Sequence, residues 1–311
     1  MKVLLMGGTG WLGHEIALQL AEAGVDFTIL SRGEKKQFVG EVDAFPMVYA
    51  DKKDENAMRE IFKTHYTHII DTVPTVPSIT NVFKYAGNIE HYIHCSSTGG
   101  YAPLPFIPCN ETALYRGFQS GSGWDKKREY DRMVLESFIN TGFPATVIRP
   151  CYITGPGMLP LDNLGGRRED FIPGIWQGKT LDVPVDGQAL LQPIHVQDLA
   201  ASFLLALANP RIAIGQVYNI CLEYALPLNR YLEINAAALG KKAVINYMSV
   251  EDMLAKYRPN IDETGLKFLA THMCFSIDKA IRDLGYQPHC TPEDAVAETA
   301  LWAAKVTGVI S

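Results

Sequence analysis

Three glycines near the amino terminus have the spacing of a phosphate-binding turn. Gly7, Gly10 and Gly13 follow the apolar run 3–6 and precede a helical pattern over 16–21. In such a turn the first glycine permits a tight bend, the second lets the backbone approach a pyrophosphate, and the third lets the helix pack closely. Because a helix N-terminus attracts phosphate, the turn predicts dinucleotide binding. A βαβ unit whose glycines serve only packing is the alternative.

A basic residue follows the second apolar run. Residues 27–30 lead into Ser31 and Arg32, with Lys35 and Lys36 close behind. A carboxylate at this strand end commonly binds the ribose 2′-hydroxyl of NAD, whereas a basic residue suits the 2′-phosphate of NADP. We therefore predict NADP(H) as the preferred cofactor, with NAD(H) as the alternative. The alternative interpretation of Arg32 is that it stacks on adenine or points into water.

Alternating strands and helices would hold these residues in place. We expect strands at 48–50, 68–71, 92–95 and 145–148, and helices at 55–64, 79–85 and 126–140. This alternation predicts an α/β fold with a Rossmann-type, doubly wound parallel sheet.

The composition of the sequence changes after Pro150. Glycine and proline cluster between 155 and 187, and short strands at 217–220 and 243–247 mix with helices at 197–208, 228–239 and 292–307. We predict a dinucleotide-binding domain over 1–150. A smaller α/β substrate lobe would take most of 151–311, with about 190–222 returning to the Rossmann core.

Bulk properties exclude several classes of partner. The 311 residues carry a net charge of −6, so no basic excess is available for DNA, and RNA is not expected. The six cysteines are scattered without close pairs of the metal-binding kind. A core strand begins the chain and no apolar run approaches the roughly twenty residues of a membrane span, so we expect no signal peptide and no membrane association. A cytoplasmic location with free thiols is the simplest expectation.

Several motifs occur in a familiar order. They are 7–13, Asp51, Ser96-Ser97 with Tyr101, 147–150 leading into 154–157, 193–200, 217–220 and 284–288. Together they resemble the extended short-chain dehydrogenase/reductase superfamily, in its NAD-dependent epimerase/dehydratase group. The resemblance implies these cofactor-binding residues: Gly7, Thr9, Gly10, Trp11, Leu12, Gly13, Ser31, Arg32, Asp51, Thr72, Val73, Ser96 and Pro150. Asp51 would neighbour the adenine amino group, or it caps the helix that begins near Glu55.

The usual catalytic pair of that family is missing. Its members use a Tyr as acid/base and a Lys one helical turn later, whose charge favours the phenolate. Counting back from Glu136 puts Arg132 at the Lys position and Arg128 at the Tyr position. Taking Tyr130 instead puts Val134 where the cation should stand. The chain therefore resembles an atypical member.

Other side chains are candidates for the chemistry. Ser97 would orient the substrate oxygen, with Ser96 or Thr98 as substitutes, and Arg132 would hold a positive charge near the nicotinamide ribose. Tyr130 is the helical candidate for the acid/base, and Tyr115 in the preceding loop is another. Ordinary packing is the competing interpretation of each tyrosine.

The substrate side is less defined. Sugar-nucleotide members hold the diphosphate with an arginine before the His-Val segment, where this chain has Gln192. Arg167 and Arg168 could hold a carboxylate or phosphate, or pair with neighbouring acids. We place Thr98, Tyr101 and His195 on the substrate side as well. Cys95 and Cys151 are expected to be small core residues, Asp198 to be a structural helix-start charge, and no metal site is expected.

Two functions follow from these residues. The first is an NAD(P)-dependent oxidoreductase or epimerase-type enzyme acting on a carbonyl or hydroxyl of a small molecule, of which a sugar-like one is one option, with an active site that lacks the Tyr-x-x-x-Lys pair. The second is a catalytically weak NAD(P)-binding protein with a regulatory, sensing or RNA-associated role. A homodimer is compatible with either function.

Overall fold

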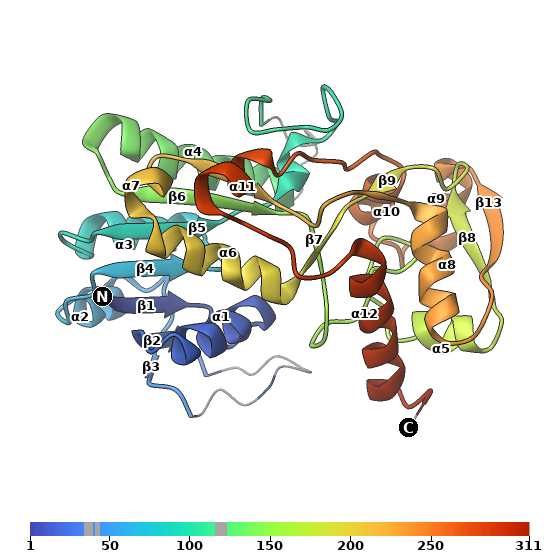
Figure 1. The fold of residues 1–311 in the computed structure, drawn as a ribbon, viewed down its shortest axis with the longest axis horizontal. Coiled ribbons are helices and arrows are strands. Elements are labelled where there is room, and N and C mark those ends of the chain that lie inside the picture. The colour runs from blue at the N-terminus through green and yellow to red at the C-terminus, as the bar shows by residue number, and fades with distance from the viewer. Residues whose placement is uncertain (34–39, 41–43, 116–122, 311) are drawn as a thin grey trace.

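The computed structural model describes residues 1–33, 40, 44–115 and 123–310, with the backbone alone at 123 and 124. Its centre is a seven-stranded parallel sheet (Figure 1). The strands follow one another across the sheet as β11 (Val217–Ile220), β6 (Ala145–Pro150), β5 (His91–Cys95), β4 (His68–Asp71), β1 (Lys2–Met6), β2 (Asp26–Ser31) and β3 (Met47–Tyr49). The predicted Rossmann-type sheet is confirmed.

Helices cover both faces of this sheet. One face carries α1 (Trp11–Glu22), α6 (Val196–Ala208), α7 (Pro210–Ala213) and α11 (Asp278–Leu284). The short helix η1 (Thr98–Tyr101) follows β5. The other face carries α2 (Glu55–Ile61), α3 (Val76–Tyr85) and α4 (Gly123–Thr141). Each face has its own apolar core, with Ile16 and Phe203 buried in one and Met58 and Val134 in the other.

Strand register brings the functional segments to one edge. Met6 pairs with Leu30 on one side and with Asp71 on the other, so Gly7, Ser31 and Thr72 follow at the same level. Parallel strands of such sheets present their ligands at their carboxyl ends. The glycine turn therefore lies between the two neighbouring strand ends.

A smaller lobe lies beside that edge (Figure 1). It contains α5 (Phe171–Trp176), β8 (Thr180–Pro184), α8 (Leu228–Ala238), β13 (Val244–Met248), α9 (Val250–Tyr257), α10 (Glu263–Leu269) and α12 (Pro292–Val306). Short pairs connect it to the sheet, namely β7 (Tyr152–Thr154) with β10 (Pro193–His195) and β9 (Leu190–Leu191) with β12 (Leu226–Pro227). The division at residue 150 stays a prediction, while β11 lies within the main sheet and α6 packs on α1.

Two cysteines are bonded rather than free. Cys151 and Cys221 form a disulfide with their Cα atoms 5.6 Å apart, so the expectation of free thiols is wrong at these positions. The reason is the register of β6 and β11. Pro150 pairs with Ile220 at the strand ends, and the residue that follows each strand is a cysteine. Cys95, Cys109, Cys274 and Cys290 are free thiols.

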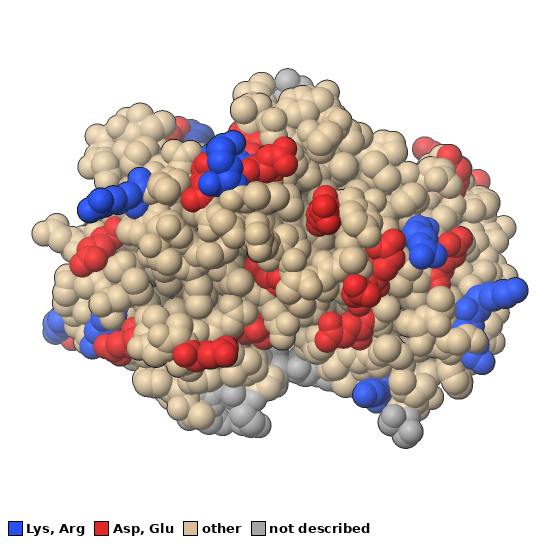
Figure 2. All heavy atoms as spheres, in the orientation of Figure 1, with Lys and Arg blue, Asp and Glu red and all other residues tan. Residues whose placement is uncertain are grey.

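The surface carries mixed charge. On the face shown in Figure 2, the Lys and Arg side chains lie apart from one another among Asp and Glu, without a continuous basic area among the residues described there. Each helix within the described part of the chain is too short or too polar to span a bilayer.

Candidate cofactor and substrate site

The glycine turn has the geometry that close approach requires. Gly7 adopts φ +91°, which a side chain would strain, and its carbonyl accepts the N–H of Gly10 at 3.0 Å. A Cβ on Gly13 would stand 2.1 Å from the Gly7 carbonyl oxygen, so only glycine lets α1 begin this close to the strand end. The first N–H groups of α1 lack helical acceptors and are available to a phosphate. The turn therefore fits a dinucleotide pyrophosphate.

A pocket of about 340 Å³ lies on one side of the turn. Its lining includes seven of the predicted cofactor-binding residues, namely Gly7, Thr9, Gly10, Ser31, Arg32, Asp51 and Val73. Its wall also holds Lys52 and Lys53, which the sequence analysis missed. Lys35 and Lys36 lie outside the described residues.

Asp51 lies in this pocket and does not cap the next helix. Its carboxylate accepts the backbone N–H of Lys53 at 2.9 Å, whereas Asp54 caps α2. The alternative interpretation of Asp51 as an N-cap is therefore wrong. Lys52 is held against the sheet, with Nζ 2.5 Å from Asp71 Oδ1 and 2.7 Å from the Val73 carbonyl. Basic groups and one carboxylate thus share the pocket wall.

A second pocket of about 560 Å³ lies on the other side of the turn. The predicted residues on its wall are Gly10, Trp11, Leu12, Gly13, Thr72, Val73, Ser96, Ser97 and Pro150. Cys95, Lys127, Cys151, Ile153, Gly157, Met158 and Leu159 complete it and were not predicted as site residues. Since Gly10 and Val73 line both pockets, the two meet at the glycine turn.

The predicted register of α4 is wrong. Arg132 points to solvent, with a side chain 67% exposed and an ion pair to Glu136 at 3.6 Å. Tyr130 packs against the apolar core beneath α4 and lines neither pocket. Lys127 is the cation that reaches the second pocket, with Nζ 3.4 Å from the carbonyl oxygen of Cys95.

With Lys127 as the cation of α4, the position one helical turn earlier is not a tyrosine. Lys127 and Asp131 have the same spacing as Arg132 and Glu136, so spacing alone could not distinguish the two pairs. Asp131 is buried and accepts from Arg149 Nε at 2.9 Å, which turns this face of α4 toward the sheet. One helical turn before Lys127 stands Gly123, where the family's pattern has its tyrosine.

Tyr115 contacts the two serines that follow β5, Ser96 and Ser97. Its hydroxyl donates to the Ser97 carbonyl at 2.5 Å and lies 3.1 Å from Ser96 Oγ. The Arg149 guanidinium carbon lies 3.9 Å from the centre of the ring. Burial raises the pKa of Tyr115 well above its usual range, so the hydroxyl stays protonated. It lines neither of the two pockets at the glycine turn.

Tyr101 does not reach the site either. It is fully buried, donates to Asn219 Oδ1 at 3.1 Å and accepts from Arg149 Nη1 at 2.5 Å. Burial raises its pKa to about 12 despite the opposing charge of Arg149. Its predicted place on the substrate side is therefore wrong, because its hydroxyl serves the internal network around Arg149.

A third pocket of about 480 Å³ adjoins the second. Ser97 and Cys151 line both pockets, and two residues predicted as substrate-binding, Thr98 and Arg167, line the third. Cys151 therefore borders the site and is also partly buried against the core. Arg167 donates to the carbonyl oxygens of Leu159 and Ile153, the latter at 2.8 Å.

Two predicted substrate residues lie elsewhere. Arg168 turns to Asp162 at 3.0 Å and Asp170 at 3.7 Å, so it pairs with acids and leaves the pocket. His195 caps α6 and its Nε2 lies 3.1 Å from Glu298, away from the three pockets. Both are structural contacts of the lobe.

The chain matches known proteins along most of its length. The family model described as "NAD dependent epimerase/dehydratase family" matches residues 3–86 and 75–221. A curated relative, the chloroplast stem-loop binding protein of 41 kDa b from Arabidopsis thaliana, is 27% identical over 92% of this chain and 75% of its own. A UDP-glucose 4-epimerase from Yersinia enterocolitica is 24% identical over 71% of this chain and 77% of its own.

Solved structures share the fold. An epimerase from Methanothermobacter thermautotrophicus superposes with a TM-score of 0.79 at 20% identity, covering 99% of this chain and 93% of its own. A dTDP-glucose 4,6-dehydratase from Streptomyces venezuelae, solved with NAD bound, gives 0.77 at 18% identity, covering 99% and 98%. The glycine turn and the parallel sheet agree with the sequence match over residues 3–221. The chain belongs to the NAD-dependent epimerase/dehydratase family.

Proposed function

We propose that the protein binds a nicotinamide dinucleotide across the two pockets that meet at the glycine turn. The pyrophosphate would lie on the turn, the adenosine near Asp51 and Arg32, and the nicotinamide between Ser97 and Lys127. The observation that carries this proposal is Gly13, because a side chain there would clash with the Gly7 carbonyl and fill the cradle. The NAD-bound dehydratase of the same fold supports it.

NADP(H) is the proposed preference. Arg32 and Lys53 line the adenosine pocket and could contact a ribose 2′-phosphate, while Asp51 favours a free hydroxyl. Titrating the protein with NADPH and NADH tests the preference. Tighter binding of NADH would reverse it without touching the proposed dinucleotide site.

The proposed reaction is hydride transfer to or from a small, sugar-like substrate in the third pocket. When bound, the cofactor would supply or accept the hydride. Ser97 would hold the substrate oxygen, because it lines both the second and the third pockets. Lys127 would stabilise negative charge developing on that oxygen, as the one Lys or Arg among the described residues of the second pocket.

The proton would move without a tyrosine. The Tyr115 hydroxyl contacts Ser96 and Ser97, and burial raises its pKa, so it would act as a positioning group. We assign proton donation to the Lys127 ammonium, directly or through the Ser97 hydroxyl. Turnover should therefore be slower than with the usual pair.

The test is a search for oxidation of NADPH with aldehydes, ketones and keto-sugars. Ser97→Ala should lower kcat about 10- to 100-fold by removing a positioned hydrogen bond. Tyr130→Phe is the matched control and should leave turnover unchanged. Turnover that survives Ser97→Ala unchanged, or is lost with Tyr130→Phe, would refute the assignment.

A catalytically weak cofactor-binding protein is the second candidate. Gly123 at the tyrosine position favours it, and the curated stem-loop binding relative suggests an RNA-associated form. Saturable NADPH binding with no oxidation across the panel would support this candidate. Retention of a labelled RNA stem-loop at 150 mM salt, stronger with cofactor than without, would support the RNA-associated form.

A further inference from the structure

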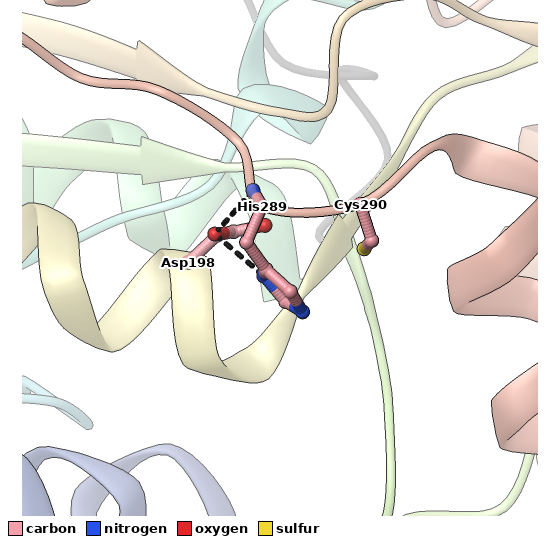
Figure 3. Close-up of side chains that lie close together, drawn as sticks. All are labelled: Asp198, His289 and Cys290. Atoms are coloured by element: carbon pink, nitrogen blue, oxygen red, sulfur yellow. Dashed lines mark hydrogen bonds and ion pairs between the residues drawn. The ribbon is translucent and has the colours of Figure 1, made fainter.

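Three side chains that bind metals in proteins meet beside the first turn of α6 (Figure 3). Asp198 belongs to α6, while His289 and Cys290 belong to the segment between α11 and α12. One potential ligand atom from each lies within 4.8 Å of the other two. The cluster lines none of the three pockets described above, so it is independent of the proposed function.

Asp198 holds His289 with one carboxylate oxygen, and its other oxygen has no hydrogen-bond partner in the described part of the chain. Oδ1 accepts the backbone N–H of His289 at 3.0 Å and lies 2.8 Å from its Nδ1. Oδ2 is buried and has no hydrogen-bond partner among the described residues, and the Asp198 side chain is 6% exposed. A buried carboxylate oxygen without a partner is costly, so a ligand that supplies positive charge there would be stabilised.

The surroundings favour a cation. Asp198 and His289 line a surface depression together with Glu15 and Glu22, which are carboxylates on α1. A second imidazole, His195, stands edge-on to His289 with ring centres 4.7 Å apart and contacts Glu298. Negative charge therefore gathers around a donor set that lacks any Lys or Arg among the described lining residues.

The donor types define the kind of metal. A thiolate, an imidazole nitrogen and a carboxylate oxygen together suit zinc and similar transition metals, whereas calcium and magnesium take oxygen ligands. We propose that Asp198, His289 and Cys290 bind one divalent, thiol-binding transition metal ion of the zinc class. Three protein ligands would leave a fourth position for water.

Spacing along the chain does not predict this site. Asp198 and His289 lie 91 residues apart, and the fold brings them together. A metal there would join α6 to the segment leading into α12, which Thr291 caps. In α12, Thr299 Oγ1 accepts the N–H of Gly155 at 2.7 Å, so the ion would add a further link between the lobe and the Rossmann core.

The experiment is a Co²⁺ titration of the untagged, chelator-treated full chain, without added thiols so that Cys151–Cys221 stays closed. We expect one equivalent of Co²⁺ to produce the near-ultraviolet thiolate-to-cobalt band and the visible bands of a tetrahedral site. Zn²⁺ should displace the Co²⁺ and raise the Tm in a concentration-dependent way.

Variants assign the site. Cys290→Ser should abolish the thiolate band and weaken Zn²⁺ binding by at least about 10-fold. Cys274→Ser is the matched control, a free and partly exposed cysteine outside the cluster, and should retain the band. X-ray absorption of the zinc-loaded wild type needs no variant and should show one sulfur at about 2.3 Å. A zinc shell without sulfur, a band that survives Cys290→Ser, or no Tm increase would each overturn the proposal.

Discussion

Lys127 carries the positive charge of the second pocket, which Arg132 was predicted to supply. It reaches the strand end at Cys95, while Arg132 on the same helix pairs with Glu136 in solvent. A flexible ammonium can donate a proton, which an arginine cannot do. We propose that Lys127 corresponds to the lysine of the usual catalytic pair and serves both cofactor binding and proton donation.

At this scale, Lys127→Met should weaken NADPH binding. Loss of a hydrogen bond from a charged group costs about 1.5–3 kcal/mol, which corresponds to roughly a 10- to 100-fold rise in Kd. Calorimetric titration measures the change. Lys126→Met removes an equal charge from the exposed neighbouring position and should leave Kd within about 2-fold. Equal effects of the two substitutions would contradict the assigned role of Lys127.

At the scale of elements, a buried ion pair sets the rotation of α4. Asp131 lies one helical turn after Lys127 and pairs with Arg149 at the end of β6. Burial alone would raise the pKa of Asp131, but the hydrogen bond from His94 and the charge of Arg149 lower it on balance. The helix is thereby held with Lys127 toward the pocket.

We expect Arg149→Met to destabilise the protein strongly. Removing one partner of a buried pair leaves the other charge uncompensated, at a cost of about 3–5 kcal/mol in the free energy of unfolding. Arg132→Met breaks an exposed i,i+4 pair and should cost no more than about 0.5 kcal/mol. Urea denaturation of both variants measures the contrast. Similar losses in the two would show that the Asp131–Arg149 pair does not fix α4.

Strand β5 should make the stability depend on pH. Burial, with a smaller contribution from the charge of His68, lowers the pKa of His91 to about 4. An unfolded histidine titrates near pH 6.5, so between about pH 6.5 and 4 the unfolded state binds more protons than the folded state. Stability should therefore fall as the pH is lowered through this window, by about 2 kcal/mol between pH 7 and 5 for this group.

Urea denaturation at several pH values tests the effect of His91. His91→Gln should flatten the profile between pH 7 and 5, whereas His65→Gln, at an exposed position, should leave its slope unchanged. An unaltered slope in His91→Gln would contradict the link between burial and acid sensitivity.

At the scale of the whole molecule, periodic patterns predicted more than isolated side chains did. Strands such as 68–71 and 217–220 were predictable because buried parallel strands are short apolar runs. The glycine turn was predictable because strand, turn and helix are contiguous. Short helices such as α5 and α10, with six and seven residues, give too little periodicity to detect.

Residues brought together by the fold were the ones missed. Asp131 and Glu136 offered two equally spaced registers for α4, and only the burial of Asp131 against Arg149 distinguishes them. Cys151 and Cys221 lie 70 residues apart and meet through strand register. Tyr101 follows the strand-end serines but turns inward to Asn219. Local spacing carries no information about such contacts.

We propose that the cradle formed by Gly7, Gly10 and Gly13 at the start of α1 binds the pyrophosphate of a nicotinamide dinucleotide. Isothermal titration of the full chain with NADPH and with NADH tests it most directly. We expect saturable binding of one dinucleotide per chain, accompanied by a rise in Tm. Absence of both heat and thermal stabilisation with either coenzyme would contradict it.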